Sequence, residues 1–165
     1  MSTSAGAPRF EGPLKDFADY VRSLDQGYVP TVGQFDLMAI HRLAPMVVVL
    51  DVLAEERRLR CRFVGTKVVA MHGSDATGRD VQDLFVEADG VRELIESYWR
   101  VADAARPLFT RSRVMRPDEP DQLFAYGRLA VPLLDEAGRV ARIATVITRC
   151  RADEMTTDFS AVDVA

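Results

Sequence analysis

The strongest indication of the fold is a single long amphipathic helix, which lies between two groups of strand-like segments. Apolar residues at helical spacing predict this helix from Val91 to Ala105, and Pro107 ends it. Two strand-like segments precede the helix and three follow it. Because helices and strands do not alternate as they do in βαβ units, the order favours an antiparallel sheet. We therefore expect an α+β fold, with a five-stranded antiparallel sheet and helices packed on one face.

The first pair of strands is predicted between Met46 and Phe63. Met46–Leu53 is rich in valine, which is typical of a mostly buried strand, and a polar turn separates it from a second strand that begins near Leu59. In the second strand apolar residues alternate with arginines, so we expect one apolar and one cationic face. The apolar set is Leu59, Cys61 and Phe63, and the cationic set is Arg58, Arg60 and Arg62.

The remaining three strands are predicted after the long helix. Pro117 and Pro120 are expected in the loop after the first of them, and Asp135-Glu136-Ala137-Gly138 forms a short hairpin loop between the last two. The three strands are Leu108–Met115, Leu123–Leu134 and Val140–Arg149.

An N-terminal amphipathic helix is predicted from Pro13 to Leu24, because proline suits the first turn of a helix. Its apolar stripe can cover the sheet of its own chain or pair with a second copy, and both alternatives stay open. The stripe, which we assign to dimerisation, consists of Leu14, Phe17, Val21 and Leu24.

Short helices are predicted at Leu37–Leu43, with Asp36 as its N-cap, and at Thr66–Met71 and Asp80–Phe85. Residues 1–12 are expected to form a flexible tail and residues 151–165 a polar tail. A single domain, including the N-terminal helix at residues 13–24, then occupies residues 13–150.

The charge of the chain argues against nucleic-acid binding. Its 21 basic and 25 acidic residues give a net charge of -4, whereas electrostatic binding to nucleic acid favours a basic domain.

The longest apolar run, Leu43–Leu50, is too short to span a bilayer. Cys61 and Cys150 form no Cys-x-x-Cys pair, which favours a reduced, cytoplasmic protein.

Several local segments, together with the order of elements, resemble the PAS domain superfamily, in particular a bacterial family of small stand-alone PAS domains. The resemblance covers roughly residues 14–149. It rests on Tyr28-Val29-Pro30, Arg62-Phe63-Val64-Gly65-Thr66, Thr77-Gly78-Arg79-Asp80, Tyr126, Arg128 and Val131-Pro132-Leu133.

This resemblance implies a sensory or interaction module whose sheet and helices can enclose a small ligand, and a sheet or N-terminal helix used for dimerisation. Arginine binds carboxylates through two parallel hydrogen bonds, so an inward-pointing arginine can hold an anionic ligand. The alternative for any single arginine is a position on a solvated or dimer-facing surface of the sheet, where it pairs with acidic residues. Our candidate ligand-binding residues are Arg62, Tyr126, Arg128, His72 and Trp99.

The sequence contains no complete motif for flavin, haem, metal or phosphate binding. Cys61-Arg62-Phe63 resembles part of the flavin-binding motif of blue-light PAS domains, but it falls in a strand before the helical region, so Cys61 is expected to be a buried core residue. The long helix carries no histidine for haem, and His41 and His72 lack the spacing of metal ligands. The glycines at 73 and 78 match a phosphate loop without its lysine. We expect neither covalent flavin nor haem, no metal and no enzymatic activity; the cofactor stays unknown.

The sequence therefore predicts a PAS-type sensory module that binds a small anionic or apolar ligand, a protein partner, or both. We expect it to signal through dimerisation or helix repacking, to form a homodimer and to pass its signal to a separate protein. The alternatives are a structural dimerisation domain with a filled core and a small enzyme that uses the same cavity. A cavity of roughly 300 Å³ or more would separate a ligand binder from a filled core.

Overall fold

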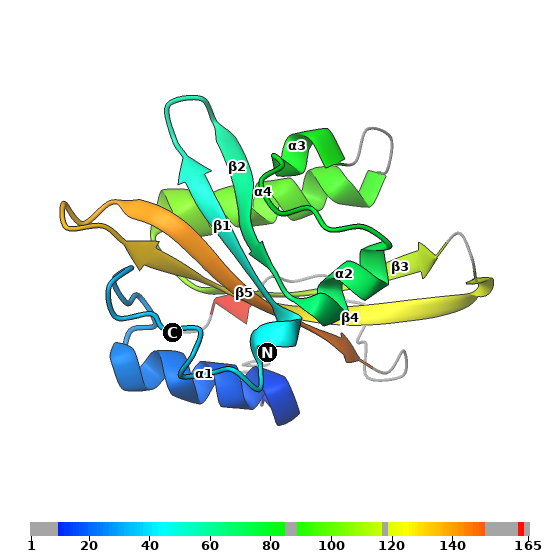
Figure 1. Cartoon of the computed structure of the whole chain (residues 1–165), viewed down its shortest axis with the longest axis horizontal. Coiled ribbons are helices and arrows are strands. Elements are labelled where there is room, and N and C mark those ends of the chain that lie inside the picture. The colour runs from blue at the N-terminus through cyan, green and yellow to red at the C-terminus, as the bar shows by residue number, and fades with distance from the viewer. Residues whose placement is uncertain (1–9, 85–88, 117–118, 151–161, 164–165) are drawn as a thin grey trace, which may run out of the picture.

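A six-stranded antiparallel sheet with helices on both faces forms the body of the chain (Figure 1). The structure, a computed structural model, describes residues 10–84, 89–116, 119–150 and 162–163. The strands follow the order β2-β1-β5-β4-β3-β6. They are β1 (Val47–Leu53), β2 (Arg58–Val64), β3 (Leu108–Arg116), β4 (Glu119–Leu134), β5 (Val140–Cys150) and β6 (Val162–Asp163). The helices are α1 (Gly12–Leu24), the 3-10 turn η1 (Ala44–Met46), α2 (Thr66–His72), α3 (Val81–Leu84) and α4 (Asp89–Ala104).

The predicted α+β class and five long antiparallel strands are confirmed. The sixth strand, β6, is a two-residue segment on the outer edge of β3, and the polar-tail prediction did not anticipate it. At the other end, Phe10, which belongs to the predicted N-terminal tail, packs edge-on against Phe109, with ring centroids 5.1 Å apart. Pro120, expected in a loop, belongs to β4.

A β-bulge in β2 changes which face its residues occupy. Val49 pairs with Phe63 and the next residue, Leu50, pairs with Cys61, so Arg62 is the extra residue. Cys61 therefore packs in the core on the face that α2, α3 and α4 cover, which we call the helix-covered face. Phe63 packs against the core on the other face, which α1 covers. The prediction that Leu59, Cys61 and Phe63 share one face is wrong for Phe63.

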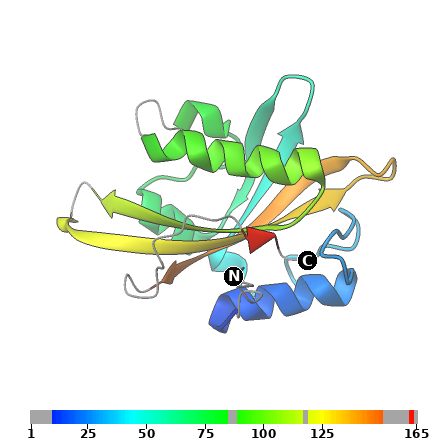
Figure 2. The same ribbon diagram turned by 180° about the vertical axis from the view of Figure 1, so that it is seen from behind.

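Helix α1 covers the opposite face of the sheet from α2, α3 and α4, as Figure 2 shows from behind. Leu14, Phe17 and Val21 are buried against the strands of their own chain, and Leu24 is half-buried. The stripe assigned to dimerisation is thus already covered within one chain. A dimer built on it would require α1 to leave its own sheet.

Residues 36–46 form successive turns that end in η1, so the predicted helix at Leu37–Leu43 is wrong. Asp36 still acts as a local cap: its carboxylate accepts a hydrogen bond of 2.8 Å from the Met38 N–H. Two later short helices form close to their predicted positions, as α2 and α3. Only Ile40 and Leu43 of the turn region are buried, which leaves too few apolar contacts to favour a regular helix.

The turn between β1 and β2 is fastened to α4 by Arg57. Its guanidinium lies 3.9 Å from the centre of the Trp99 ring and forms two hydrogen bonds of 2.8 Å with the Asp103 carboxylate. Cation–π contact and bidentate pairing reinforce each other here, because one planar group makes both. The turn, β2 and α4 are therefore held together at one end of the helix-covered face.

Replacing Arg57 by alanine is expected to expose the ring of Trp99 to water. Trp99 is the single tryptophan of the chain, so intrinsic fluorescence reports on it alone. We expect a red shift of a few nanometres in Arg57→Ala and no shift in Arg62→Ala, an exposed arginine that contacts Asp51 instead. Identical emission from both variants would contradict the Trp99 contact.

Candidate functional site

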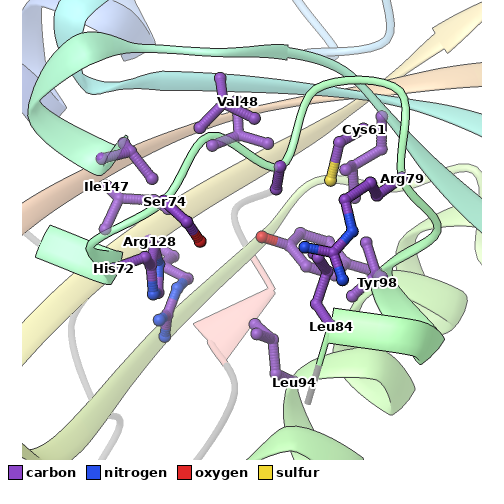
Figure 3. Close-up of a pocket in the computed structure, with 15 residues that line it drawn as sticks. Val48, Cys61, His72, Ser74, Arg79, Leu84, Leu94, Tyr98, Arg128 and Ile147 are labelled. Carbon is purple, nitrogen blue, oxygen red and sulfur yellow. The ribbon is translucent and has the colours of Figure 1, made fainter. Parts of the chain in front are cut away.

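A cavity of about 330 Å³ opens between the helix-covered face of the sheet and helices α2, α3 and α4 (Figure 3). Its walls are mostly aliphatic, since β1 supplies Val48 and Leu50, α2 supplies Val68 and β5 supplies Ile147. Val48 and Leu50 both lie inward because alternate residues of a strand share one face of the sheet. The cavity is thus enclosed by the sheet on one side and by the short helices on the other.

Five polar side chains line this cavity, and they divide into a buried pair and an exposed group. Arg128 on β4 and Tyr98 on α4 are buried, with Arg128 only 8% exposed. His72, Ser74 and Arg79, at and after the end of α2, are exposed at the cavity mouth. In Figure 3, Arg128 lies beside His72, and Arg79 points inward from the side of Cys61. The site therefore has an apolar floor and a cationic, hydrogen-bonding rim.

The electrostatics of the cavity favour negative charge in a ligand. Among the described residues that line it there is no Asp or Glu, but there are two arginines. Although His72 lies at the mouth, partial desolvation of its ring there, together with the nearby Arg128 guanidinium, lowers its pKa, so its imidazole is neutral at pH 7. Burial raises the pKa of Tyr98, which keeps its hydroxyl protonated as a hydrogen-bond donor. Burial also raises the pKa of the Cys61 thiol to about 11, which leaves it unreactive.

Two of the five predicted ligand-binding residues, His72 and Arg128, line the cavity. Trp99 and Tyr126 are buried in the adjoining core but do not line it. Arg62 also lies outside it, since it follows the inward-facing Cys61 on β2, and its side chain is 50% exposed and lies 3.4 Å from the Asp51 carboxylate. The structure therefore brings only Arg128 of the two favoured arginines to the site.

Three of the polar residues at the site were not among the predicted candidates. Arg79 stands in the Thr77–Asp80 segment that carried the PAS resemblance, but nothing in that segment indicated where its side chain points. Tyr98 belongs to the apolar stripe of the long helix and was indistinguishable from a core residue. Ser74 lies in a loop, where periodicity carries no information.

Neither a metal site nor a membrane span emerges from the part of the chain that the structure describes. Within residues 10–84, 89–116, 119–150 and 162–163, no three His, Cys, Asp or Glu side chains are grouped as metal ligands would be. The helices of the same residues are all too short or too polar to cross a bilayer. Cys61 is a free, buried thiol, as expected from its sequence context.

Comparison with known proteins identifies the architecture. No family model and no curated protein matches the chain. Among solved structures, a light-oxygen-voltage domain studied with a flavin analogue matches with a TM-score of 0.54 at 14% identity, over 71% of this chain and 85% of that domain. The PAS domain of BvgS from Bordetella pertussis matches with a TM-score of 0.53 at 18% identity, over 70% of this chain and 86% of that domain.

A third similar structure, VqmA bound to DPO, has a TM-score of 0.53 at 13% identity, over 70% of this chain and 58% of VqmA. Identities this low establish the fold alone. The chain therefore has the PAS fold, and the resemblance predicted from its sequence is confirmed at that level. The similarity to a bacterial family of stand-alone domains stays a prediction.

Proposed function

We propose that this chain is a PAS-type sensory module that binds a small organic anion in the cavity beneath α2, α3 and α4. The observation that carries the proposal is a buried arginine, Arg128, in the wall of an otherwise largely aliphatic cavity. A charge-assisted hydrogen bond from such a guanidinium to a carboxylate is stronger than one in water, because its surroundings screen less. The aliphatic walls then hold the apolar part of the same ligand.

The volume of the cavity limits the size of the ligand. A cavity of about 150 Å³ is enough to bind benzene, and the one described above is about 330 Å³. A ligand of roughly a dozen non-hydrogen atoms follows from that proportion. Flavin nucleotides and haem are several times larger, so we propose a metabolite-sized acid instead.

The position of the cavity supports helix repacking as the signal. Residues from α2, α3 and α4, including Val68, Val81 and Tyr98, share its lining with the sheet. A ligand that contacts both layers favours the packing in which those contacts form, and so shifts the population toward it. A separate signalling protein or a homodimer would read that packing. A filled-core dimerisation domain is the weaker candidate, since the cavity exceeds the roughly 300 Å³ expected of ligand sites.

Native mass spectrometry of the purified protein, beside the same sample denatured, tests the proposal. We expect an added mass that disappears on denaturation and corresponds to a small acid. The same spectrum reports whether the chain is a monomer or a dimer. A bare chain at its calculated mass that also binds no carboxylate in titrations would overturn the proposal.

Acidification is expected to destabilise the fold through His72. Because its pKa is lowered in the folded state, the unfolded chain binds a proton more readily, so stability is highest above the ordinary pKa of about 6.5 and falls as pH decreases through it. In His72→Gln this contribution is absent, and the loss of unfolding free energy between pH 7.5 and pH 5.5 should be smaller than in the wild type. His41→Gln, which removes an imidazole outside the cavity, is the matched control. Equal pH dependence in wild type and His72→Gln would contradict the assignment.

A further inference from the structure

The cavity has a second cationic residue, Arg79, which enters it from the side of Cys61, whereas Arg128 lies beside His72 (Figure 3). Both guanidiniums line the same cavity, but they act on different neighbours: Arg128 affects the pKa of His72 and Tyr98, whereas Arg79 affects that of Cys61. Figure 3 shows the same separation, with Arg79 pointing into the cavity from its own side. Arg79 is therefore placed to bind a second anionic group, apart from one that binds Arg128 beside His72.

Two carboxylates share the surroundings of Cys61 with Arg79, and other groups hold both of them. Asp75 accepts hydrogen bonds from the N–H and hydroxyl of Thr77, at 2.9 and 2.7 Å. Asp80 contacts Arg58 and Arg60, the latter at 2.9 Å. Within the described part of the chain, no hydrogen bond or ion pair engages the guanidinium of Arg79. Its charge is thus available to a ligand.

Residues 78–80 are fixed to the outer edge of the sheet in an arrangement that we call the Asp80 clip. The Cys61 N–H donates to the Arg79 carbonyl at 2.9 Å, and the Gly78 N–H donates to the Cys61 carbonyl at 2.7 Å. This is the hydrogen-bond pattern of an added strand on β2, an otherwise open edge. Asp80, whose side chain is only 11% exposed, lies between the two β2 arginines and anchors the segment.

We propose that Arg79 is the selectivity residue of this cavity, making it prefer ligands with two separated anionic groups, and that Asp80 is a positioning residue that holds Arg79 there. The inference rests on the proposed function and narrows its ligand class. One acidic group binds Arg128, the apolar part of the ligand contacts the aliphatic walls, and the second acidic group binds Arg79. The Asp80 clip fixes the backbone on both sides of Arg79, so its guanidinium stays at the mouth without a side-chain partner of its own.

The test compares α,ω-dicarboxylates from succinate to sebacate with the matching monocarboxylates, by calorimetric or NMR titration of the full chain. In the wild type the best dicarboxylate is expected to bind at least about tenfold more tightly than its monocarboxylate. Arg79→Gln, an exposed and hence tolerated change, should reduce that ratio to near one. Asp80→Asn should lower the ratio, whereas Asp83→Asn, which removes an exposed carboxylate that contacts Arg58, should not.

A merely structural role for Asp80 would weaken both ligand series equally, so the ratio separates positioning from folding. An unchanged ratio in Arg79→Gln overturns the inference while leaving a working anion site. If neither series binds the wild type, the inference is also overturned. The native mass spectrum then shows whether the proposed function fails with it: a retained small molecule preserves that function, and a bare chain does not.

Discussion

Gly65→Ala is expected to lower the free energy of unfolding by at least about 3 kcal/mol. Gly65 connects β2 to α2, and a Cβ atom at this position would lie 2.3 Å from the carbonyl oxygens of both Ala44 and Pro45. These are backbone atoms, which cannot turn aside as a flexible side chain can. Moving Gly65 itself would break the 2.8 Å hydrogen bond from its N–H to the Val47 carbonyl. Its φ of -63° suits any residue, so the requirement for glycine here is the close approach alone.

Chemical and thermal denaturation check this prediction. A loss of 3 kcal/mol corresponds to a fall of roughly 6–12 °C in Tm for a chain of this size. Gly33→Ala is the matched control, because the nearest atom to its added Cβ is the Thr31 Oγ1 at 4.0 Å. We expect the control to stay within about 0.5 kcal/mol of the wild type. Equal stability of the two variants would show that η1 does not crowd Gly65.

The same substitution is expected to disturb the ligand site. Gly65 begins α2, and α2 supplies Val68 and His72 to the cavity. If the chain accommodates the methyl group by shifting α2 away from η1, both residues move with it. A folded fraction of Gly65→Ala should therefore bind carboxylates more weakly than the wild type, even though Gly65 itself does not line the cavity.

The spacing of apolar residues along the sequence correctly predicted the long helix and the three closing strands. The predicted helix at Val91–Ala105 corresponds to α4, and the three closing strands correspond to β3, β4 and β5. These elements could be predicted because apolar residues recur in the sequence with the period of a helix, 3.6, or of a strand, 2. The prediction failed where tertiary contacts decide. The predicted helix at Leu37–Leu43 gave way to turns, and the bulge at Arg62 reversed the face of Phe63.

Two predicted residues, His72 and Arg128, line the cavity, and for Arg128, which the PAS resemblance had favoured, strand alternation gives the physical reason. Arg128 shares a strand face with Tyr126 and Ala130, all three of which are buried, so its inward direction follows from the pattern of β4. Arg62 was favoured by the resemblance alone, because strand alternation already placed it on the cationic face opposite Cys61, and the structure puts it outside the cavity. Arg79 depends on the pairing of its segment with β2, a contact across 18 positions of sequence that no local pattern reveals.

Arg128→Leu is expected to reduce the affinity for a monocarboxylate by about 2 kcal/mol or more, close to a thirtyfold weakening or beyond. The ligand loses its charge-assisted hydrogen bonds inside a cavity where little water competes for them. The fold should survive, since leucine is an apolar residue on a strand face that is already buried. NMR titration with octanoate measures the affinity, and thermal denaturation of the same samples measures the stability.

Arg62→Leu provides the matched control, because it removes the other arginine that carried the PAS resemblance. Arg62 is half exposed and contacts Asp51 outside the cavity, so its loss should leave octanoate affinity unchanged. A weakening confined to Arg128→Leu places the ligand's carboxylate against β4, between the aliphatic floor and the mouth. Equal affinities in wild type and both variants, with all three folded, would remove the anion site. The cavity would then hold a neutral molecule through its aliphatic walls.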